Sequence, residues 1–169
     1  MFLKWNVGVI FMLQFDDMYD NKVMLSFEYL PFSEHPKHVW VICKYRDTWL
    51  LTKHKNRGLE FPGGKVEQGE SADEAAIREV KEETGGIVDM LYYVGQYKVN
   101  GRDKTIIKNV YFAQIKEIEK QAHYFETKGP VLLQSLPSNI KSNNAYSFIM
   151  KDDVLTFSIQ KLREKQFIN

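Results

Sequence analysis

Three glutamates in one short segment, Glu79, Glu82 and Glu83, are the residues of this chain best placed to do chemistry. Spacings of three and four residues put side chains on one side of an α-helix, where neighbouring carboxylates repel one another. By Coulomb's law this repulsion is roughly 1 kcal/mol per pair at about 4 Å in water, and several times larger where solvent is excluded. The cluster therefore predicts a positively charged partner.

The flanking residues predict the helix that would carry this cluster. Ser71 and Glu74 have the spacing of a capping box, in which each side chain satisfies a free backbone N–H of the first helical turn. Gly85 supplies the left-handed residue that commonly ends a helix. We therefore expect a helix from about residue 72 to residue 84. Its core-facing stripe would consist of Ala76, Ile77 and Val80.

A turn with the sequence Phe-Pro-Gly-Gly, residues 61–64, precedes the predicted helix. Its two glycines let the backbone approach a ligand closely and leave a carbonyl oxygen free to bind a cation. Carboxylate and carbonyl oxygens are the ligands that Mg²⁺ prefers, and Mg²⁺ often shares its coordination shell with substrate phosphates. The segment therefore predicts metal-assisted phosphate chemistry, and the alternative is a solvated acidic helix face.

The residues from Gly64 to Gly85 follow the pattern Gly-x5-Glu-x7-Arg-Glu-U-x-Glu-Glu-x-Gly-U, where U is a bulky aliphatic residue. This pattern resembles the Nudix hydrolases, and the flanking segments resemble their MutT-like branch; eight fixed positions are far more specific than a lone glycine motif. Only the last position departs, since Gly86 stands there, and we expect looser packing after the helix. The resemblance implies an α/β fold, a Nudix-type α/β/α sandwich with a mixed β-sheet between helices.

The resemblance also implies roles for single residues. The metal ligands would be Gly63, Glu79, Glu82, Glu83 and Glu126, with Mg²⁺ as the cofactor and Mn²⁺ as a substitute. Glu79 would also orient the attacking water, although family members take the general base from different carboxylates and the choice stays open. The expected catalytic set is Arg78, Glu79 and Glu82, and the other motif positions that support the site are Gly64, Glu70 and Gly85.

For two of these residues, Arg78 and Glu70, the charge of the side chain by itself suggests a role. Arg78 is expected to orient a glutamate of the cluster through a bidentate, charge-assisted pair, and an exposed helix charge is the alternative. Glu70 is expected to support the site from the helix entrance, or merely to interact with the helix dipole.

Substrate contacts are expected from residues outside the motif. Lys53 or Arg57 could reach a phosphate, because both lie just before the glycine turn. Phe61 is a candidate wall for a purine base, and Asn143 or Asn144 is a candidate reader of the base edge. A role in a loop or turn is the alternative for each.

The rest of the chain is predicted to be mostly strand. Apolar and aromatic runs indicate strands near residues 23–27, 39–44, 49–54, 91–99, 105–115 and 131–133. Asn100-Gly101 is a strong hairpin signal between two of them. A C-terminal helix is expected to begin near Asp152 or Asp153 and to run through Leu162.

Composition favours one compact catalytic domain. The chain has 169 residues, of which 44% are apolar. We expect an N-terminal extension or extra strand over residues 1–21 and a single Nudix hydrolase domain over residues 22–169. Residues 60–90 hold nine acidic and three basic side chains, a charge of −6, so the net charge of +1 leaves +7 elsewhere. An acidic site in a basic frame is therefore expected.

The cellular location and the partners are predicted from features that the sequence lacks, namely a second cysteine and a long apolar segment. Cys43 is the single cysteine, which excludes an internal disulfide and fits a reducing cytoplasm. The apolar run after Lys4 is too short for a membrane span and is followed by Asp16 and Asp17 where a signal peptide would have a cleavage site. We expect a cytoplasmic enzyme with no membrane contact and no obligate protein partner.

The resemblance implies three functions in order of preference. The first is hydrolysis of nucleoside triphosphates, including oxidised purines such as 8-oxo-dGTP, to the monophosphate and pyrophosphate. The second is removal of pyrophosphate from triphosphorylated RNA 5′ ends, with Tyr97 or Trp49 stacking on unpaired bases unless both are core residues. The third is a non-catalytic nucleotide sensor, whose expected mark is an eroded acidic motif, and here every acid is present.

Overall fold

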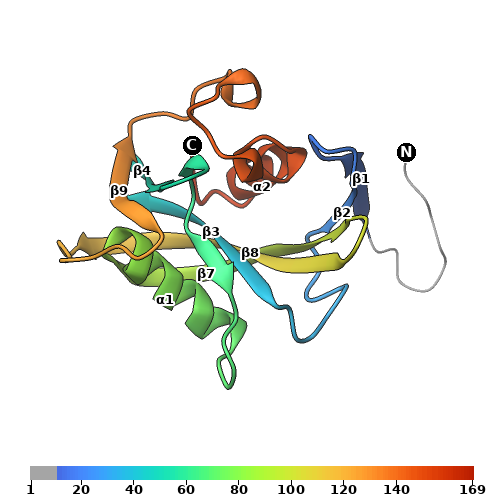
Figure 1. The fold of residues 1–169 in the computed structure, drawn as a ribbon, viewed down its shortest axis with the longest axis horizontal. Helices are drawn as coiled ribbons and strands as arrows, with labels where there is room; N and C mark the ends of the chain where they lie inside the picture. Colours follow the sequence, from blue (N-terminus) through green and yellow to red (C-terminus); the bar gives the residue numbers. More distant parts are fainter. Residues whose placement is uncertain (1–10) are drawn as a thin grey trace.

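The computed structural model describes residues 11–169, which form one mixed sheet with a helix on each face (Figure 1). Its strands are β1 (Met12–Asp16), β2 (Lys22–Ser26), β3 (His38–Tyr45), β4 (Thr48–His54), β5 (Gly58–Glu60), β6 (Gly63–Lys65), β7 (Gly86–Asn100), β8 (Thr105–Ile118) and β9 (Thr127–Leu133). The helices are α1 (Ala72–Thr84) and α2 (Asp153–Glu164), preceded by the short 3₁₀ turns η1 (Ile140–Ser142) and η2 (Phe148–Met150). The predicted α/β sandwich is confirmed.

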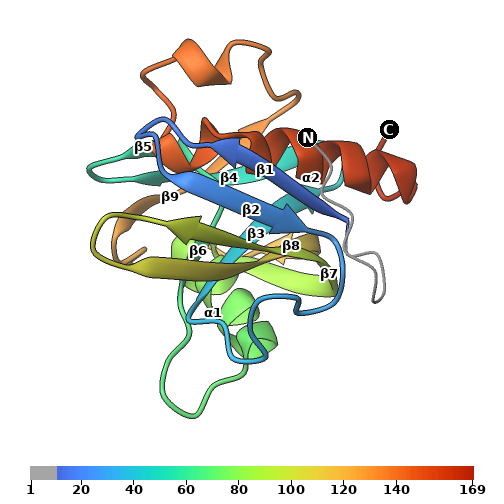
Figure 2. The same cartoon turned by 90° about the vertical axis from the view of Figure 1, so that its right-hand side faces the viewer.

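The sheet runs in the order β1-β2-β7-β8-β3-β4-β5, with β6 added beside β3 and β9 beside β4. Only β3 and β8 pair in parallel; the other strand pairs within residues 11–169 are antiparallel. The predicted hairpin at Asn100-Gly101 is confirmed, since Asn100 faces Thr105 across β7 and β8. The long β7–β8 hairpin extends beneath β2, and the β1–β2 hairpin continues the sheet beyond it (Figure 2).

Helix α1 has the predicted ends. Ser71 is the N-cap of a complete capping box with Glu74, and Gly85 closes the helix with a φ of 72°. The stripe that faces the core differs from the prediction, because Ile77 is 45% exposed and the carboxylate residue Glu83 is buried instead. The core face lies about one position away from the purely apolar stripe, since the helix packs its small residues Ala75 and Ala76 against the sheet.

Gly86 corrects the expectation of loose packing after α1. The residue is buried at the start of β7, and a Cβ placed there would come within 2.9 Å of the Thr84 hydroxyl and 3.0 Å of Val80. An aliphatic side chain at this position would have to displace these neighbours, so the packing after the helix is tight and not loose.

Two cores hold the helices against opposite faces of the sheet. On one face Ala75, Ala76 and Val80 of α1 pack on β3. On the other face Leu155, Ile159 and Leu162 of α2 pack on a larger cluster that includes Trp40, Phe61 and Phe112. The predicted C-terminal helix is confirmed, with Asp152 as its N-cap. The acidic helix and α2 are therefore separated by the thickness of the sheet.

Two short strands, β5 and β6, were not predicted, and β1 lies within residues 1–21, where an extension or an extra strand was expected. β1 pairs with β2, and its Phe15 packs against Phe157 of α2 with ring centroids 5.7 Å apart. Residues 1–10 of the expected N-terminal extension lie outside the described residues, so the division at residue 22 stays a prediction. Within the described part of the chain, neither helix has the length and apolar character that crossing a membrane requires.

Candidate active site

A pocket of about 730 Å³ lies between the glycine turn, the acidic side of α1 and the loop before β9. It gathers seven of the residues that the sequence singled out, together with Phe125, which it did not. Those seven are Gly63, Gly64, Arg78, Glu79, Glu82, Glu83 and Glu126. Glu126 is 43 positions from Glu83 in the sequence, so the fold brings this carboxylate to the helix.

Glu83 is the most perturbed member of the cluster. Its side chain is 5% exposed and accepts a hydrogen bond of 3.2 Å from the Gly63 N–H. Burial raises the pKa of this carboxyl to about 8, with further contributions from the negative charges of Glu79 and Glu60. Its backbone carbonyl accepts from the hydroxyls of Thr52 and Thr127, at 3.0 and 3.1 Å. The fold thus fixes a carboxyl group where its charge is least favourable.

Arg78 is shared between the helix entrance and the cluster. Its guanidinium forms a bidentate pair with Glu70, at 2.8 and 3.0 Å, and donates to Glu79 at 2.9 Å and Glu82 at 3.2 Å. A further bond reaches the Lys65 carbonyl. The bidentate partner is therefore Glu70, and the carboxylates of the cluster take single bonds. Burial raises the pKa of Glu79 even against the effect of Arg78, whereas Arg78 lowers the pKa of Glu70.

The glycine turn fits closely over these carboxylates. A Cβ on Gly64 would overlap the Glu79 carboxylate, and a Cβ on Gly63 would come within 2.5 Å of the Val39 carbonyl. Only glycine at position 64 leaves room for Glu79 to point into the pocket. The role of this residue is therefore to admit the carboxylate.

Glu126 enters the pocket on a loop that is tied to the end of β4. The Lys55 N–H donates to the Glu126 carbonyl at 3.1 Å, and the Lys55 ammonium donates to the Phe125 carbonyl. The Glu126 carboxylate lies 3.9 Å from Nε2 of His54 and is 79% exposed. His54 is buried, and its Nδ1 accepts the N–H groups of Asn56 and Arg57. Sequence reasoning missed His54, because no spacing links it to Glu126.

Glu60 is a second residue that the sequence did not reveal. It is 2% exposed and is paired with Arg57, whose guanidinium nitrogens lie 2.7 and 3.2 Å from the two carboxylate oxygens. The charges of this pair act on Glu83, so Arg57 lies beside the acidic pocket but is already engaged. An i, i+3 charge pair was visible in the sequence, but its burial was not.

The donor set suits a divalent metal ion, although residues 11–169 hold no group of three His, Cys, Asp or Glu side chains close enough to form a ready-made site. Five glutamates line one pocket, the four named above and Glu67, and Arg78 is the cation that holds two of them. Burial and the nearby charges of Glu79 and Glu60 raise the pKa of Glu83, so a bound cation would favour its charged form. Hard oxygen ligands in such a pocket are typical of Mg²⁺ sites.

The residues predicted to read the substrate are not gathered in this pocket. Phe61 is 1% exposed and packs edge-on against Trp40 and Trp49, so it is a core residue in this structure and not the wall of a base site. Lys53 is exposed on β4, outside the pocket lining. Asn143 and Asn144 follow η1; the Asn143 side chain accepts from the Ala145 N–H, which is the turn role given as the alternative.

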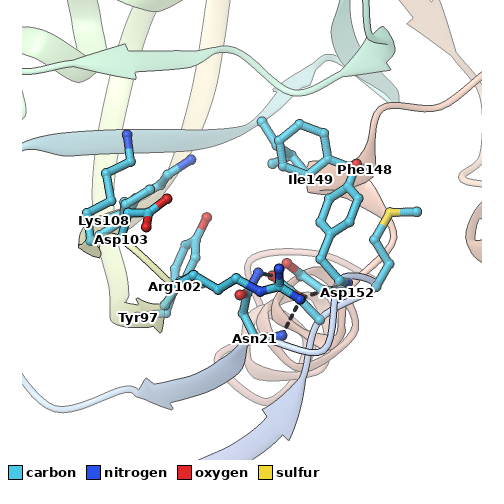
Figure 3. A pocket seen from close by; sticks show the side chains of 15 residues that line it. Asn21, Tyr97, Arg102, Asp103, Lys108, Phe148, Ile149 and Asp152 are labelled. Carbon is cyan, nitrogen blue, oxygen red and sulfur yellow. Dashed lines mark hydrogen bonds between the residues drawn. The ribbon is translucent and has the colours of Figure 1, made fainter.

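A second pocket of about 320 Å³ opens on the α2 face of the sheet. Figure 3 shows Tyr97 and Lys108 at one wall and Phe148 and Ile149 at the other, with Arg102 between them. Tyr97 is buried, and burial raises the pKa of its hydroxyl and lowers that of the Lys108 ammonium. No residue lines both this pocket and the acidic one.

The fold and this acidic site agree with comparisons to known proteins. The NUDIX domain family model matches residues 34–138, well over half of the chain. The chain therefore belongs to the Nudix hydrolase family, whose members use divalent metal ions. The resemblance read from the motif is confirmed.

The chain is also similar to individual proteins of known sequence or structure. The chain is 60% identical over 157 residues to the Bacillus subtilis (strain 168) protein YtkD, whose name proposes an 8-oxo-dGTP diphosphatase activity; the match covers 93% of this chain and 99% of that protein. A mutant of the Bacillus subtilis pyrophosphohydrolase BsRppH is similar in structure, with a TM-score of 0.92, 59% identity, and coverage of 94% and 100%. A Nitrosomonas europaea NUDIX hydrolase, at 20% identity and a TM-score of 0.62, shares the fold over 77% of this chain and 90% of its own.

Proposed function

We propose that this protein is a Mg²⁺-dependent pyrophosphohydrolase that cleaves a nucleoside 5′-triphosphate group into the monophosphate and pyrophosphate. The observation that carries the proposal is the buried Glu83 carboxyl, whose pKa rises to about 8 beside Glu79 in a pocket with three further glutamates. Strongly perturbed pKa values cluster at functional sites, and a bound cation would offset the charges of these carboxylates.

The residues divide the work by their positions. Glu79, Glu82, Glu83 and Glu126 would hold the metal, with the Gly63 carbonyl as a further ligand. Bound Mg²⁺ supplies charge neutralisation of the phosphates and activation of water. Arg78 keeps Glu79 and Glu82 oriented through the hydrogen bonds already described. Glu79 is our candidate for orienting the water, since it is less buried than Glu83 and faces the glycine turn.

Free nucleotides, including 8-oxo-dGTP, remain the first substrate class that we propose. The similarity to YtkD, whose name carries that activity, supports it. Under this proposal the acidic pocket would hold the triphosphate group, which all nucleoside triphosphates share.

Triphosphorylated RNA 5′ ends are a second candidate, and the pocket on the α2 face favours it. That pocket offers a hydroxyl, an ammonium and a carboxyl group, from Tyr97, Lys108 and Asp152, which are suitable groups for reading a base edge. The charges of the Arg57–Glu60 pair act on both Lys108, which lines this pocket, and Glu83, which lines the acidic one. The structural relative BsRppH is described as a pyrophosphohydrolase, which is compatible with either class.

A competition assay decides between the two candidates. The wild-type protein with Mg²⁺ is given 8-oxo-dGTP, the four ordinary nucleoside triphosphates and a 5′-triphosphorylated six-nucleotide RNA at matched concentrations, and pyrophosphate is measured. Release from free nucleotides alone rejects the RNA candidate. Release of pyrophosphate from no substrate, with nucleotide binding intact, would overturn the enzymatic proposal in favour of a sensor. The buried, unpaired Cys43 fits the cytoplasmic location that we propose with it.

A further inference from the structure

Glu126 differs from the cluster on α1 because it lies on a loop. The three glutamates of the cluster are placed by the helix itself, and Arg78 donates hydrogen bonds to two of them. The Glu126 side chain is 79% exposed. Among residues 11–169, the His54 ring is the one basic group with a nitrogen within 4.0 Å of its carboxylate. The end of β4, which carries His54, is therefore the element to consider for placing this glutamate.

Two consecutive residues at the end of β4 contact the Glu126 loop. The Lys55 N–H donates to the Glu126 carbonyl at 3.1 Å, and the Lys55 ammonium donates to the carbonyl before it. His54 pairs with Thr127 across β4 and β9, where the register shifts between Thr52 and His54. Such irregularities re-aim side chains and are frequent next to active sites. The strand pairing thus brings the His54 ring beside Glu126.

The backbone just before Glu126 is strained. Phe125 has a φ of 50°, a left-handed conformation that bulky residues rarely adopt. The Phe125 carbonyl is the group that the Lys55 ammonium holds. Strain of this kind persists where the surrounding contacts maintain it, and it is frequent at functional sites. The contacts from β4 therefore hold the loop in a conformation that carries Glu126 into the acidic pocket.

Hydrogen bonds from the turn after β4 fix the orientation of the His54 ring. The ring is buried, and its Nδ1 accepts the N–H groups of Asn56 and Arg57, at 3.1 and 3.2 Å. A ring nitrogen that accepts a hydrogen bond carries no proton, so the ring proton of His54 is on Nε2. Nε2 is the atom that lies 3.9 Å from the Glu126 carboxylate. The ring therefore directs an N–H group at Glu126.

We propose that His54 is a positioning residue that holds one carboxylate oxygen of Glu126 and leaves the other oxygen free for the metal ion. The inference rests on the role of metal ligand given to Glu126 under the proposed function. The separation of 3.9 Å is longer than a hydrogen bond, and a rotation of the exposed Glu126 side chain would close it. Loss of a partner that orients a metal ligand typically lowers metal affinity or activity by about 10–100-fold.

The test uses two substitutions that each keep one half of the His54 ring. His54→Asn places an amide oxygen near the position of Nδ1, so the turn keeps its acceptor while the donor to Glu126 is lost. His54→Gln places an amide N–H near the position of Nε2, so the donor is kept while the turn loses its acceptor. His123→Asn is the matched control, because His123 is exposed on the same loop and does not line the acidic pocket.

Metal affinity is the main measurement, and it needs no substrate. The Kd of Mn²⁺ is obtained from the electron paramagnetic resonance signal of the free ion, and melting temperatures are measured in EDTA. We expect His54→Asn to bind Mn²⁺ about tenfold more weakly than the wild type and to melt at a similar temperature. His54→Gln should bind Mn²⁺ nearly as tightly as the wild type and melt at a lower temperature, because two N–H groups lose their acceptor. His123→Asn should match the wild type in both.

Unchanged Mn²⁺ binding in His54→Asn would overturn the proposal, and so would equal losses in His54→Asn and His54→Gln. If His54→Asn does not fold, long-range ¹H–¹⁵N spectra of the wild type in EDTA report the position of the ring proton. A proton on Nε2 supports the proposal, and a proton on Nδ1 overturns it.

A double-mutant cycle with Glu126→Gln separates positioning from a general structural effect. Because His54 acts through Glu126, His54→Asn should have no further effect on Mn²⁺ binding once Glu126→Gln is present. The same loss in both backgrounds would show that His54 acts elsewhere and would overturn the proposal.

The same measurements separate the inference from the function on which it rests. A wild type that hydrolyses nucleoside triphosphates, while Glu126→Gln binds Mn²⁺ as tightly as the wild type, leaves the function standing and removes the role of His54. A wild type that binds Mn²⁺ and shows the expected cycle, but hydrolyses no triphosphate, removes the function and leaves the positioning role. A wild type that does not bind Mn²⁺ removes both.

Discussion

At the scale of single residues, hydrogen bonds hold the buried Glu83 carboxyl group close to other negatively charged carboxylates. Glu83 is buried with its carbonyl fixed by two threonine hydroxyls and its carboxyl held by the Gly63 N–H. Arg78 holds Glu79 and Glu82 but does not reach Glu83 through any hydrogen bond in the described residues. The carboxyl group of the helical cluster with the most raised pKa is therefore the one that Arg78 does not hold.

Glu83→Gln should change activity and stability in opposite directions. Removing a metal-ligand charge costs several kcal/mol in the transition state, so kcat should fall by roughly a hundredfold or more.

The folded-state pKa of Glu83 is raised from its ordinary 4.5 to about 8. Its contribution to stability is therefore present below pH 4.5 and lost as the pH rises toward 8. In EDTA the variant should melt at a higher temperature than the wild type at pH 8, with the difference vanishing near pH 4.5. Thermal melts across this range, with circular dichroism as the probe, measure it; a variant less stable at pH 8 would contradict the origin given for the raised pKa.

Gly64→Ala should remove activity and leave the fold. The backbone at this position does not need glycine, but the new Cβ would overlap the Glu79 carboxylate and force it out of place. We expect kcat to fall at least about tenfold, because a misplacement of about 1 Å can cost more than that, while the melting temperature changes little.

Gly69→Ala is the matched control for this substitution. Gly69 has a φ of 81° and no atom within 4 Å of the added Cβ. Its substitution should cost about 1 kcal/mol of stability through backbone strain, with activity retained. Wild-type kcat in Gly64→Ala would refute the role given to the glycine turn.

At the scale of elements, the two helices lie on opposite faces of the sheet and have different roles. Helix α1 carries the acidic cluster, and its start is tied to the sheet by a buried chain of hydrogen bonds from Gln96 through Asn109 and Tyr111 to Asp73. Helix α2 closes the larger core and begins at Asp152, which also lines the second pocket. One residue thus caps a helix and borders a candidate binding surface.

Asp152→Asn should stabilise the protein at alkaline pH. Asp152 accepts the Val154 N–H as the N-cap, and asparagine caps equally well. Burial raises the Asp152 pKa to about 7; the neighbouring charges are Lys108, Asp17 and Asp153. The stability that this carboxyl contributes is lost as the pH rises from about 4 to about 7. Urea unfolding should therefore favour the variant at pH 8 and show no difference near pH 4.

Asp152→Ala controls for the cap itself. This variant removes the side chain that accepts the Val154 N–H and should lose about 1 kcal/mol relative to Asp152→Asn at any pH. Equal pH dependence in the wild type and Asp152→Asn would show that Asp152 titrates normally.

At the scale of the whole molecule, acidic charge is concentrated in one segment. Residues 60–90 carry −6 and the remainder +7, while the chain has a net charge of only +1. The single cation that reaches the cluster by hydrogen bonds within residues 11–169 is Arg78. The folded protein should therefore bind divalent cations more strongly than the unfolded chain does.

Mg²⁺ should raise the melting temperature of the wild-type protein. A ligand at a hundred times its Kd stabilises the folded state by about 2.7 kcal/mol, which for a chain of this size is roughly 5–10 °C. Melts in EDTA, in MgCl₂ and in NaCl of equal ionic strength separate specific binding from screening. Glu83→Gln should show a smaller shift. Equal effects of MgCl₂ and NaCl would argue against a metal site.

The sequence by itself determined the acidic helix, because capping, helix termination and the i, i+3, i+4 spacing of its glutamates are local properties. It also determined most strands and the hairpin at Asn100-Gly101, since these depend on nearest neighbours along the chain. Tertiary structure decided what depends on burial and distant contacts: the exposure of Ile77, the core position of Phe61, and the burial of Glu60 and His54 beside the site. The pocket edged by Tyr19 and Phe148 is likewise set by contacts between distant segments, for which no sequence spacing provides a signal.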